Sequence, residues 1–272
     1  MALLETRGLT VTYGGLNAND NVDLDVEAGK LVGLIGPNGA GKTTFIDAIT
    51  GFTPLSAGTA LFDGSDLAGM SPDQRAHLGL SRTFQSLELF EDLTVRDNLL
   101  AAAEQPKWHS FLTDIFMPGK GEKAYLEQVE WAMDIMGLTD KADELPSDLS
   151  HGQRKLVGVS RALAAKPKLV LLDEPAAGLD TTESQVLGNH MRDVLDQDMS
   201  VFLIDHDMGL VLNVCDYIYV LDFGEIIAHG TPSEVRADPA VIAAYLGDSA
   251  GEAQAREGAT AGATSATKEE AI

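Results

Sequence analysis

Short apolar runs, each bounded by charged and turn residues, are spread along the chain. The clearest lie at 31–35, 169–172, 201–204 and 217–221, and they are rich in Leu, Val and Ile. Continuous apolar runs of this length are typical of strands that are buried on both faces of a parallel sheet. Helical stretches separate them, and this alternation predicts an α/β domain with a largely parallel sheet.

The N-terminal part has a different pattern. Short alternating stretches occur at 10–13 and 22–26, and a further stretch at 59–62 runs into the pair Asp63-Gly64, a strong hairpin-turn signal. Alternation of apolar and polar residues is typical of strands with one solvated face. We therefore expect an antiparallel β portion near the N-terminus, beside the main sheet.

In the middle of the chain, apolar residues recur at helical spacing, and Pro, Gly and charged residues separate the segments. We interpret 86–164 as an α-helical subdomain inserted between two parts of the core, 1–85 and 165–247. The last residues, 248–272, are mostly Ala, Gly, Thr, Ser and Glu without an apolar period, a composition typical of disorder. The expected organisation is one domain over 1–247, followed by a disordered tail.

Acidic residues outnumber basic ones, 42 to 19, and give a net charge of −23. Such a field repels the phosphates of nucleic acids and anionic lipid head groups, so nucleic acid is not an expected partner. The longest apolar runs are far short of the roughly 20 residues that a membrane-spanning helix needs. The start of the chain lacks the pattern of a secretory signal, and the single cysteine cannot form an internal disulfide. These features predict a cytoplasmic protein.

The apolar run 31–35 is followed directly by a glycine-rich loop and then by a helical run at 44–50. This strand–loop–helix order is the context that a P-loop requires. Its glycines let backbone N–H groups curl around phosphates, Lys42 can reach the β and γ phosphates, and Thr43 can ligate Mg²⁺. We expect a nucleoside triphosphate to be bound by Gly36, Pro37, Asn38, Gly39, Ala40, Gly41, Lys42, Thr43 and Thr44.

Two carboxylates, Asp173 and Glu174, follow the apolar run 169–172. They are expected at the carboxyl end of a buried strand, which is the edge at which α/β folds bind ligands. Asp173 suits Mg²⁺, either directly or through a water. Glu174 is suited to orient or deprotonate the attacking water, because phosphoryl transfer depends mostly on positioning and charge stabilisation.

Two classes of P-loop protein compete at this point: GTPases, and ATPases that complete their site with a second copy. The sequence has no Asn-Lys-x-Asp stretch of the kind with which GTPases select guanine. It does have Leu149–Gln153 at the start of a predicted helix. Ser150 with Gln153 makes a capping box, which alone explains these residues structurally. A capped helix start is also an anion site, and its position before Asp173 favours a grip on a γ-phosphate held by another subunit.

These segments and their order resemble the ATP-binding subunits of ABC transporters over residues 3–247. Segment 36–43 resembles the Walker A motif of that family, 149–153 its signature sequence, and 169–174 its Walker B motif with the catalytic glutamate. The resemblance implies a P-loop NTPase core of the RecA-like fold, bound ATP and Mg²⁺, and ATP hydrolysis coupled to transport across a membrane.

Four single residues take their expected roles from the resemblance. Gln85 looks like the Q-loop glutamine, which contacts Mg²⁺ or the attacking water in the family, and His206 looks like the switch histidine. Asp180 lies in a stretch similar to the D-loop, and Tyr13 matches the aromatic residue that stacks on adenine. The resemblance thus implies Glu174, His206 and Gln85 as catalytic residues, Thr43, Gln85 and Asp173 at the metal, and Tyr13, Ser150, Gly152, Gln153 and Asp180 at the nucleotide.

One residue departs from the family pattern, because the commonest signature has Gly where this chain has His151. Backbone N–H donation survives the change if the local dihedral angles stay helical. We therefore expect the signature to keep its function, with a ring that can tune ATP affinity with pH.

Beyond the shared motifs, segments 82–85, 172–179 and 230–247 resemble the ATP-binding subunits of branched-chain amino acid importers. The same group includes importers of urea and short amides. An exporter and a non-transport ABC ATPase are further alternatives. The implied partners are integral-membrane permease subunits, a second identical or similar ATP-binding subunit, and a solute-binding protein. Binding to the permease would place the chain on the inner face of the cell membrane.

Overall fold

The predicted antiparallel portion is a sheet of its own in the computed structural model, which describes residues 2–83, 89–103 and 120–245. Its strand order is β2-β1-β4-β5. The strands are β1 (Ala2–Tyr13), β2 (Leu16–Glu27), β4 (Ala57–Phe62) and β5 (Ser65–Asp66). Gly14 and Gly15 join β1 to β2 with positive φ at both positions, as a two-residue hairpin turn of type I′ requires. β1 and β2 are longer than the alternating stretches because register shifts interrupt the alternation.

The main sheet contains the apolar runs predicted from the sequence. Its order is β10-β9-β3-β8-β7-β6. The strands are β3 (Leu31–Ile35), β6 (Leu80–Arg82), β7 (Leu169–Asp173), β8 (Ser200–Ile204), β9 (Tyr217–Asp222) and β10 (Glu225–Gly230). Neighbours from β9 to β6 are parallel, whereas β10 is antiparallel to β9. The expected α/β fold, with a parallel sheet and an antiparallel N-terminal portion, is confirmed.

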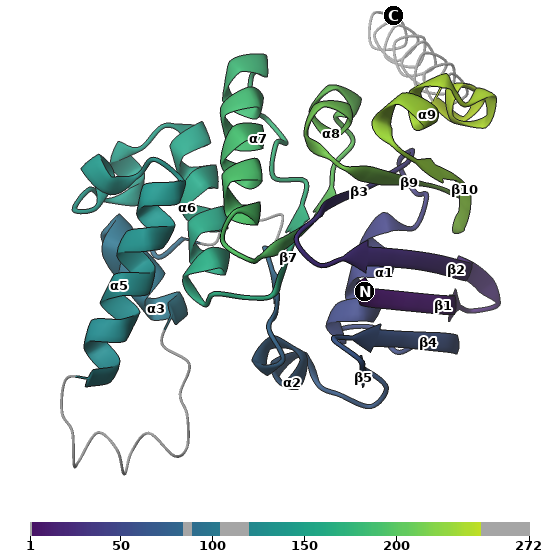
Figure 1. The fold of residues 1–272 in the computed structure, drawn as a ribbon, viewed down its shortest axis with the longest axis horizontal. Helices are drawn as coiled ribbons and strands as arrows, with labels where there is room; N and C mark the ends of the chain where they lie inside the picture. The colour runs from purple at the N-terminus through teal and green to yellow at the C-terminus, as the bar shows by residue number, and fades with distance from the viewer. Residues whose placement is uncertain (1, 84–88, 104–119, 246–272) are drawn as a thin grey trace, which may run out of the picture.

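Successive residues of the central strands pack into two different cores. Val32 and Leu34 of β3 share a core with the antiparallel sheet, whereas Leu31 and Ile35 face the opposite core. Helix α1 (Lys42–Thr50) lies between the two sheets and contributes to the first core. Helices α7 (Thr181–Leu195) and α8 (Met208–Val214) cover the other face of the main sheet (Figure 1). Both faces of the main sheet are therefore buried, which explains the unbroken apolar sequences of its central strands.

A buried arginine fixes the far end of α1. Arg75, from α2 (Pro72–His77), donates hydrogen bonds to the carbonyl oxygens of Ala48 at 2.7 Å, Ile49 at 2.8 Å and Leu67 at 2.9 Å. The carbonyl groups of a last helical turn have no partner within the helix, so this guanidinium supplies one. The helix that starts at the P-loop is thus anchored at both ends.

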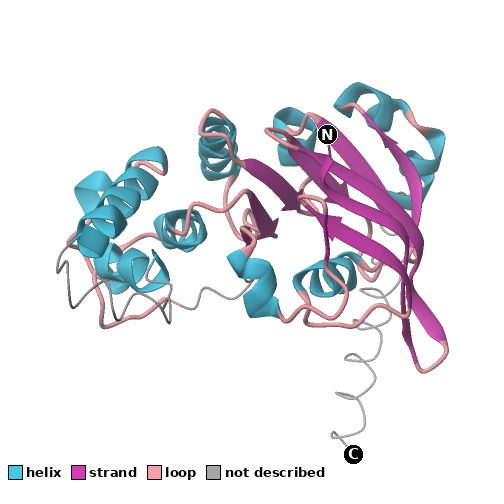
Figure 2. Ribbon diagram, turned by 60° about the horizontal axis from the view of Figure 1, so that its bottom comes forward, coloured by secondary structure: helices cyan, strands magenta, loops and turns pink. Residues whose placement is uncertain are grey.

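The predicted helical block contains a separate group of packed helices. They are α3 (Val95–Ala103), α5 (Lys120–Ile135) and α6 (His151–Ala164), with short 3₁₀ turns at Thr139–Lys141 and Pro146–Asp148. Figures 1 and 2 show these helices together at one end of the molecule, away from the antiparallel sheet. The inserted helical part is therefore present. Its exact limits, 86 and 164, stay a prediction, and the expected tail over 248–272 lies outside the described residues.

In the described part of the chain, no helix combines the length and the apolar character that crossing a membrane requires.

Candidate nucleotide-binding site

The predicted P-loop connects β3 to α1 and is pressed against neighbouring backbone. A Cβ atom at Gly36 would lie 2.0 Å from the carbonyl oxygen of Leu221, and one at Gly41 would lie 2.3 Å from that of Ala18. Gly41 is also the N-cap of α1, with a φ of 105° that favours glycine. It offers no side chain to cap the helix, so the first N–H groups of α1 are available to a phosphate.

Lys42, the first residue of α1, is buried and folds back over the loop. Its Nζ donates to the carbonyl oxygens of Gly36 at 2.6 Å and Pro37 at 2.9 Å. Phosphate oxygens make stronger, charge-assisted bonds with an ammonium group than carbonyl oxygens do. The loop therefore keeps the lysine in place for a triphosphate. The next residue, Thr43, is exposed at the same helix start, where its hydroxyl can face a ligand.

Asp173, at the end of β7, is buried, and its side chain is 6% exposed. Nη2 of Arg82 donates to its Oδ2 at 3.0 Å. Burial raises the pKa of Asp173, while the hydrogen bond and charge of Arg82 act in the opposite direction. The guanidinium therefore favours the ionised carboxylate that a metal ion needs.

The residues present fit Mg²⁺, because Asp173 and Thr43 offer hard oxygen donors. Among the described residues, no cluster of three His, Cys, Asp or Glu side chains could hold a metal ion. A magnesium site here would need phosphate oxygens as further ligands, which is the usual way in which nucleotide-binding proteins hold this ion. The metal and the nucleotide are thus expected to bind together.

Glu174 directly follows β7 in a strained conformation, with a φ of 47°. Left-handed backbone at a non-glycine residue costs about 1–3 kcal/mol and persists only when the surroundings impose it. Here the N–H of Glu174 donates to the carbonyl oxygen of Ile204 at 2.7 Å. The carbonyl oxygen of Glu174 accepts from the N–H of Ala177 at 3.2 Å and from Nζ of Lys155 at 3.4 Å. These contacts turn the backbone at the edge of the sheet, where the predicted water-orienting carboxylate must lie.

β8 brings His206 beside Glu174. Nδ1 of His206 lies 3.9 Å from Oε1 of Glu174, and its side chain is 57% exposed. The structure therefore places two of the three predicted catalytic residues together, from strands about 30 residues apart in sequence. The third, Gln85, lies outside the described residues. The catalytic roles of all three stay predictions.

Asp205, which sequence analysis missed, joins these two loops. It is fully buried, and its carboxylate accepts from the N–H of Ala176 at 3.2 Å and from that of Asp207 at 3.0 Å. Burial raises the pKa of Asp205, and these backbone hydrogen bonds lower it, as does the charge of His206. The only feature of the sequence that could have indicated this role is the position of Asp205, between the apolar run 201–204 and His206. One side chain thus ties the segment after Glu174 to the segment after His206.

The predicted signature is a capped helix start, as its capping box requires. The N–H of Gln153 donates to Ser150 Oγ at 3.2 Å, and the N–H of Ser150 donates to Gln153 Oε1 at 2.9 Å. Ser150 is the N-cap of α6, which belongs to the helical group, whereas α1 lies between the sheets (Figure 1). The P-loop and the signature are therefore carried by different parts of the chain.

The signature packs against the predicted D-loop of its own chain. A Cβ atom at Gly152 would lie 2.6 Å from Oε1 of Glu183, and one at Gly178 would lie 3.2 Å from Nε2 of His151. Asp180 caps α7 by accepting from the N–H of Glu183 at 2.8 Å. The close approach of Glu183 thus explains a glycine at position 152 without any nucleotide contact. His151 has its ring against the D-loop, and its expected effect on ATP affinity stays a prediction.

Tyr13, the predicted adenine-stacking residue, is exposed at the end of β1. Its hydroxyl lies 3.2 Å from Oγ1 of Thr53, which follows α1. The ring is accessible to a ligand, and its role at adenine stays a prediction.

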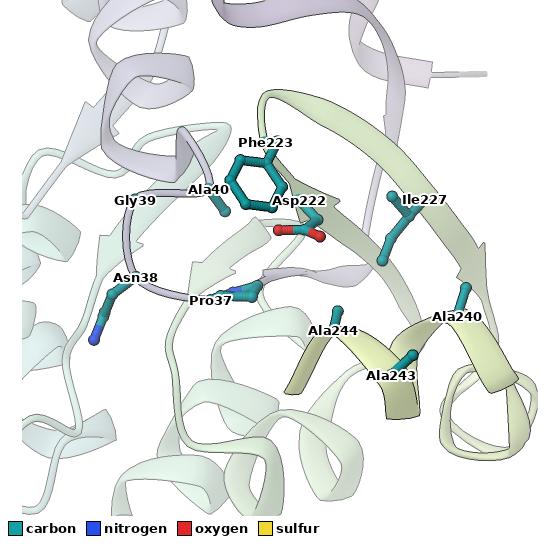
Figure 3. A pocket seen from close by; sticks show the side chains of 10 residues that line it. All are labelled: Pro37, Asn38, Gly39, Ala40, Asp222, Phe223, Ile227, Ala240, Ala243 and Ala244. Atoms are coloured by element: carbon teal, nitrogen blue, oxygen red, sulfur yellow. The ribbon is translucent and has the colours of Figure 1, made fainter. Parts of the chain in front are cut away.

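A hollow of about 680 Å³ lies beside the P-loop (Figure 3). Its walls are the loop itself, the turn between β9 and β10, and the helical residues 239–245. The turn supports the loop, because the N–H of Gly224 donates to the carbonyl oxygen of Ala40 at 2.9 Å. Phe223, at the tip, is 87% exposed with its ring beside Ala40. No local pattern in the sequence indicates this support, since the turn lies about 180 residues after the loop.

Two family models match the chain. A model described as "ABC transporter" matches residues 19–177, and one described as "Branched-chain amino acid ATP-binding cassette transporter" matches residues 225–251. The first covers the P-loop, the signature and the acidic pair.

Curated relatives are similar along nearly their whole length. The chain is 37% identical to the high-affinity branched-chain amino acid transport ATP-binding proteins BraF of Pseudomonas aeruginosa and LivG of Escherichia coli K12, over 90% of this chain and 98% of each relative. It is 33% identical to a probable LivG of Methanocaldococcus jannaschii, over 91% of this chain and 98% of that protein.

Solved structures agree with the fold. The ADP conformation of an ATP-binding cassette from an ABC transporter has a TM-score of 0.80 and 32% identity, and covers 91% of this chain and 99% of its own. A nucleotide-free ATP-binding cassette has a TM-score of 0.78 and 32% identity, with coverage of 90% and 99%.

We expect Asp205→Asn to slow ATP hydrolysis about tenfold or more. The two carboxylate oxygens accept from the N–H groups of Ala176 and Asp207, whereas the NH₂ group of an amide cannot accept, so one of these hydrogen bonds is lost. Nucleotide affinity should stay within about twofold, since the P-loop is untouched. Steady-state hydrolysis and binding of a fluorescent nucleotide measure the two effects. Asp193→Asn, which removes the same charge from an exposed site on α7, is the control. Wild-type turnover in Asp205→Asn would refute this role.

Proposed function

Because the chain belongs to the ATP-binding cassettes of ABC transporters, we propose that it is the ATPase subunit of an importer for branched-chain amino acids. The observation that carries the choice of solute is the 37% identity, over 98% of their length, to relatives named for this transport. The family match at 225–251 supports the same solute with a segment that lies outside the ATPase motifs. A urea or amide importer, an exporter and a non-transport ATPase are therefore less favoured.

The proposed catalytic cycle begins at the P-loop. Phosphate oxygens take the place of the loop carbonyls on Lys42, and the N–H groups at the start of α1, which no side chain of Gly41 caps, bind the triphosphate. Thr43, Asp173 and Gln85 would hold Mg²⁺ with the phosphates. The ion would neutralise charge that develops on the phosphoryl group.

Hydrolysis is assigned to the strained turn after β7. Glu174 would orient or deprotonate the attacking water, and His206 beside it would contact the γ-phosphate. Asp205 and Lys155 hold the backbone of this turn from two sides. The chain thereby holds the backbone of this turn in place before the nucleotide binds, and catalysis by positioning requires such rigidity near the reacting groups.

The site is proposed to be completed by a second ATP-binding subunit, identical or similar to this one. Ser150, Gly152 and Gln153 of that subunit would meet the γ-phosphate through a helix N-terminus, with Asp180 beside them. Hydrolysis would remove the bridging phosphate and let the pair open. Opening would move the integral-membrane permease subunits, which would hold the chain on the inner face of the membrane, while a solute-binding protein delivers the solute.

The chain offers a matched pair of variants for the shared site. Ser71 caps α2 with Gln74 in the same capping box that Ser150 makes with Gln153. Ser71→Ala and Ser150→Ala should each cost about 1 kcal/mol of stability. Only Ser150→Ala should weaken ATP-dependent association, by about tenfold or more, because it alone would lose a charge-assisted bond to the γ-phosphate.

Sedimentation with and without ATP measures this association, in whichever homodimer or heterodimer forms. Both variants are compared in a Glu174→Gln background, so that slow hydrolysis keeps the nucleotide bound. Equal association in the two variants would mean that Ser150 is a helix cap and nothing more.

Transport is tested in proteoliposomes that contain the permease subunits with this chain, supplied with the solute-binding protein. We expect ATP-dependent uptake of labelled leucine, and loss of uptake with Lys42→Ala, because the P-loop lysine holds the phosphates. Labelled urea in the same vesicles is the control. Uptake of urea without leucine would contradict the proposed solute and leave the ATPase assignment intact.

A further inference from the structure

Arg82 lies between the two parts of the proposed metal site. It ends β6, and its side chain is only 10% exposed. Nη1 donates to Oδ1 of Asp47 at 2.5 Å, and Nη2 donates to Oδ2 of Asp173 at 3.0 Å. The two nitrogens of one guanidinium thus bind two carboxylates that are 126 positions apart in the sequence.

Each of these carboxylates belongs to an element that carries a proposed metal residue. Asp47 follows Thr43 by four residues on α1, so the two residues lie on the same face of the helix, one turn apart. Asp173 itself ends β7. The distance between α1 and the end of β7 is therefore set by Arg82 on the side of the metal site.

The bridge to Arg82 involves only one of the two carboxylate oxygens of Asp173. Among the described residues, the side-chain hydrogen bonds of Asp173 involve Oδ2, the oxygen that Arg82 holds. The other oxygen, Oδ1, is then available for the ion or for a water bound to it. A carboxylate this deeply buried is costly to keep charged without a partner, and Arg82 supplies the partner before any metal arrives.

We propose that Arg82 is a positioning residue for the metal ion: its guanidinium clamps α1 to β7 so that Thr43 and Asp173 stand ready for a divalent cation bound with nucleotide. This inference rests on the metal assignment made above. The planar fork of arginine is needed, because its two nitrogens serve different carboxylates, and the single ammonium of a lysine does not reproduce that geometry.

A purely structural ion pair predicts a different outcome from a clamp on the metal site. Loss of a structural pair lowers the stability of the fold without selective effect on metal affinity. Loss of the clamp changes metal affinity while nucleotide binding without metal remains, because the P-loop and Lys42, which holds the loop carbonyl of Gly36, are the residues assigned to the phosphates, whereas Arg82 holds Asp173. The two accounts are therefore separated by measuring metal and nucleotide binding independently.

The test uses the full chain with ADP, and Mn²⁺ as a paramagnetic replacement for Mg²⁺. ADP affinity in EDTA is measured with a fluorescent analogue, and Mn²⁺ affinity of the ADP complex by electron paramagnetic resonance. For Arg82→Gln we expect ADP affinity in EDTA within about twofold of wild type and a loss of about 10–100-fold in Mn²⁺ affinity. Arg82→Lys, which keeps the charge, should also lose Mn²⁺ affinity and serves if the Gln variant does not fold.

The control is Arg192→Gln, which removes the same charge and an ion pair with Asp216 at 2.9 Å, away from the metal site. It should leave Mn²⁺ affinity unchanged. In an Asp173→Asn background, adding Arg82→Gln should cause no further loss, because the residue through which Arg82 acts is already gone.

Folded Arg82 variants with wild-type Mn²⁺ affinity would overturn the inference, as would an equal loss of ADP affinity in EDTA. If Asp173→Asn loses Mn²⁺ affinity while Arg82→Gln keeps it, the inference alone fails. If Asp173→Asn keeps full Mn²⁺ affinity, the metal assignment fails, and the clamp with it.

Discussion

The site depends on the alignment of three parallel strands at one edge of the main sheet. β8 pairs with β3 on one side and with β7 on the other, so Ile204 lies opposite both Leu34 and Asp173. The P-loop, Glu174 and the loop of His206 each leave the sheet directly after these paired positions. Because the strands are buried on both faces, a slip in register would expose apolar residues and is strongly disfavoured. The hydrophobic pattern that builds the sheet thereby also positions the P-loop, Glu174, which is the proposed catalytic carboxylate, and His206.

Individual polar side chains then connect the loops that this edge brings together. Asp205 joins the segments that follow Glu174 and His206, and Lys155 connects the helix that starts at the signature to the carbonyl of Glu174. Arg82 joins α1 to the end of β7. A displacement of the helical part would therefore reach the turn at Glu174 through Lys155. These contacts give the proposed coupling between partner subunits and hydrolysis a physical route within one chain.

The parts of the site that could be predicted from the sequence are those with a local pattern. Apolar runs revealed the strands, glycines next to Lys42 revealed the P-loop, and Ser150 with Gln153 revealed the capped helix. The bridging roles of Arg82 and Asp205 could not be found in this way, because each side chain connects segments that are distant in sequence. Segment 82–85 carries a family resemblance, but the resemblance does not indicate which carboxylates Arg82 binds. The turn at Gly224 supports the P-loop through a backbone hydrogen bond, which no residue type signals. The expected roles of Gln85 came from family resemblance alone, and that residue lies outside the described part of the chain.

One nucleotide is proposed to be enclosed by two chains, between the P-loop of one and the signature of the other. This shared site is tested most directly by mixing two defective versions, Lys42→Ala in one chain and Ser150→Arg in the other, in whichever homodimer or heterodimer forms. Each version alone should be nearly inactive, since every site it builds has one damaged half. Mixing should restore part of the ATPase activity, because one composite site is then made from two intact halves. No recovery in mixed dimers, or full activity from a demonstrably monomeric wild-type chain, would contradict the shared site.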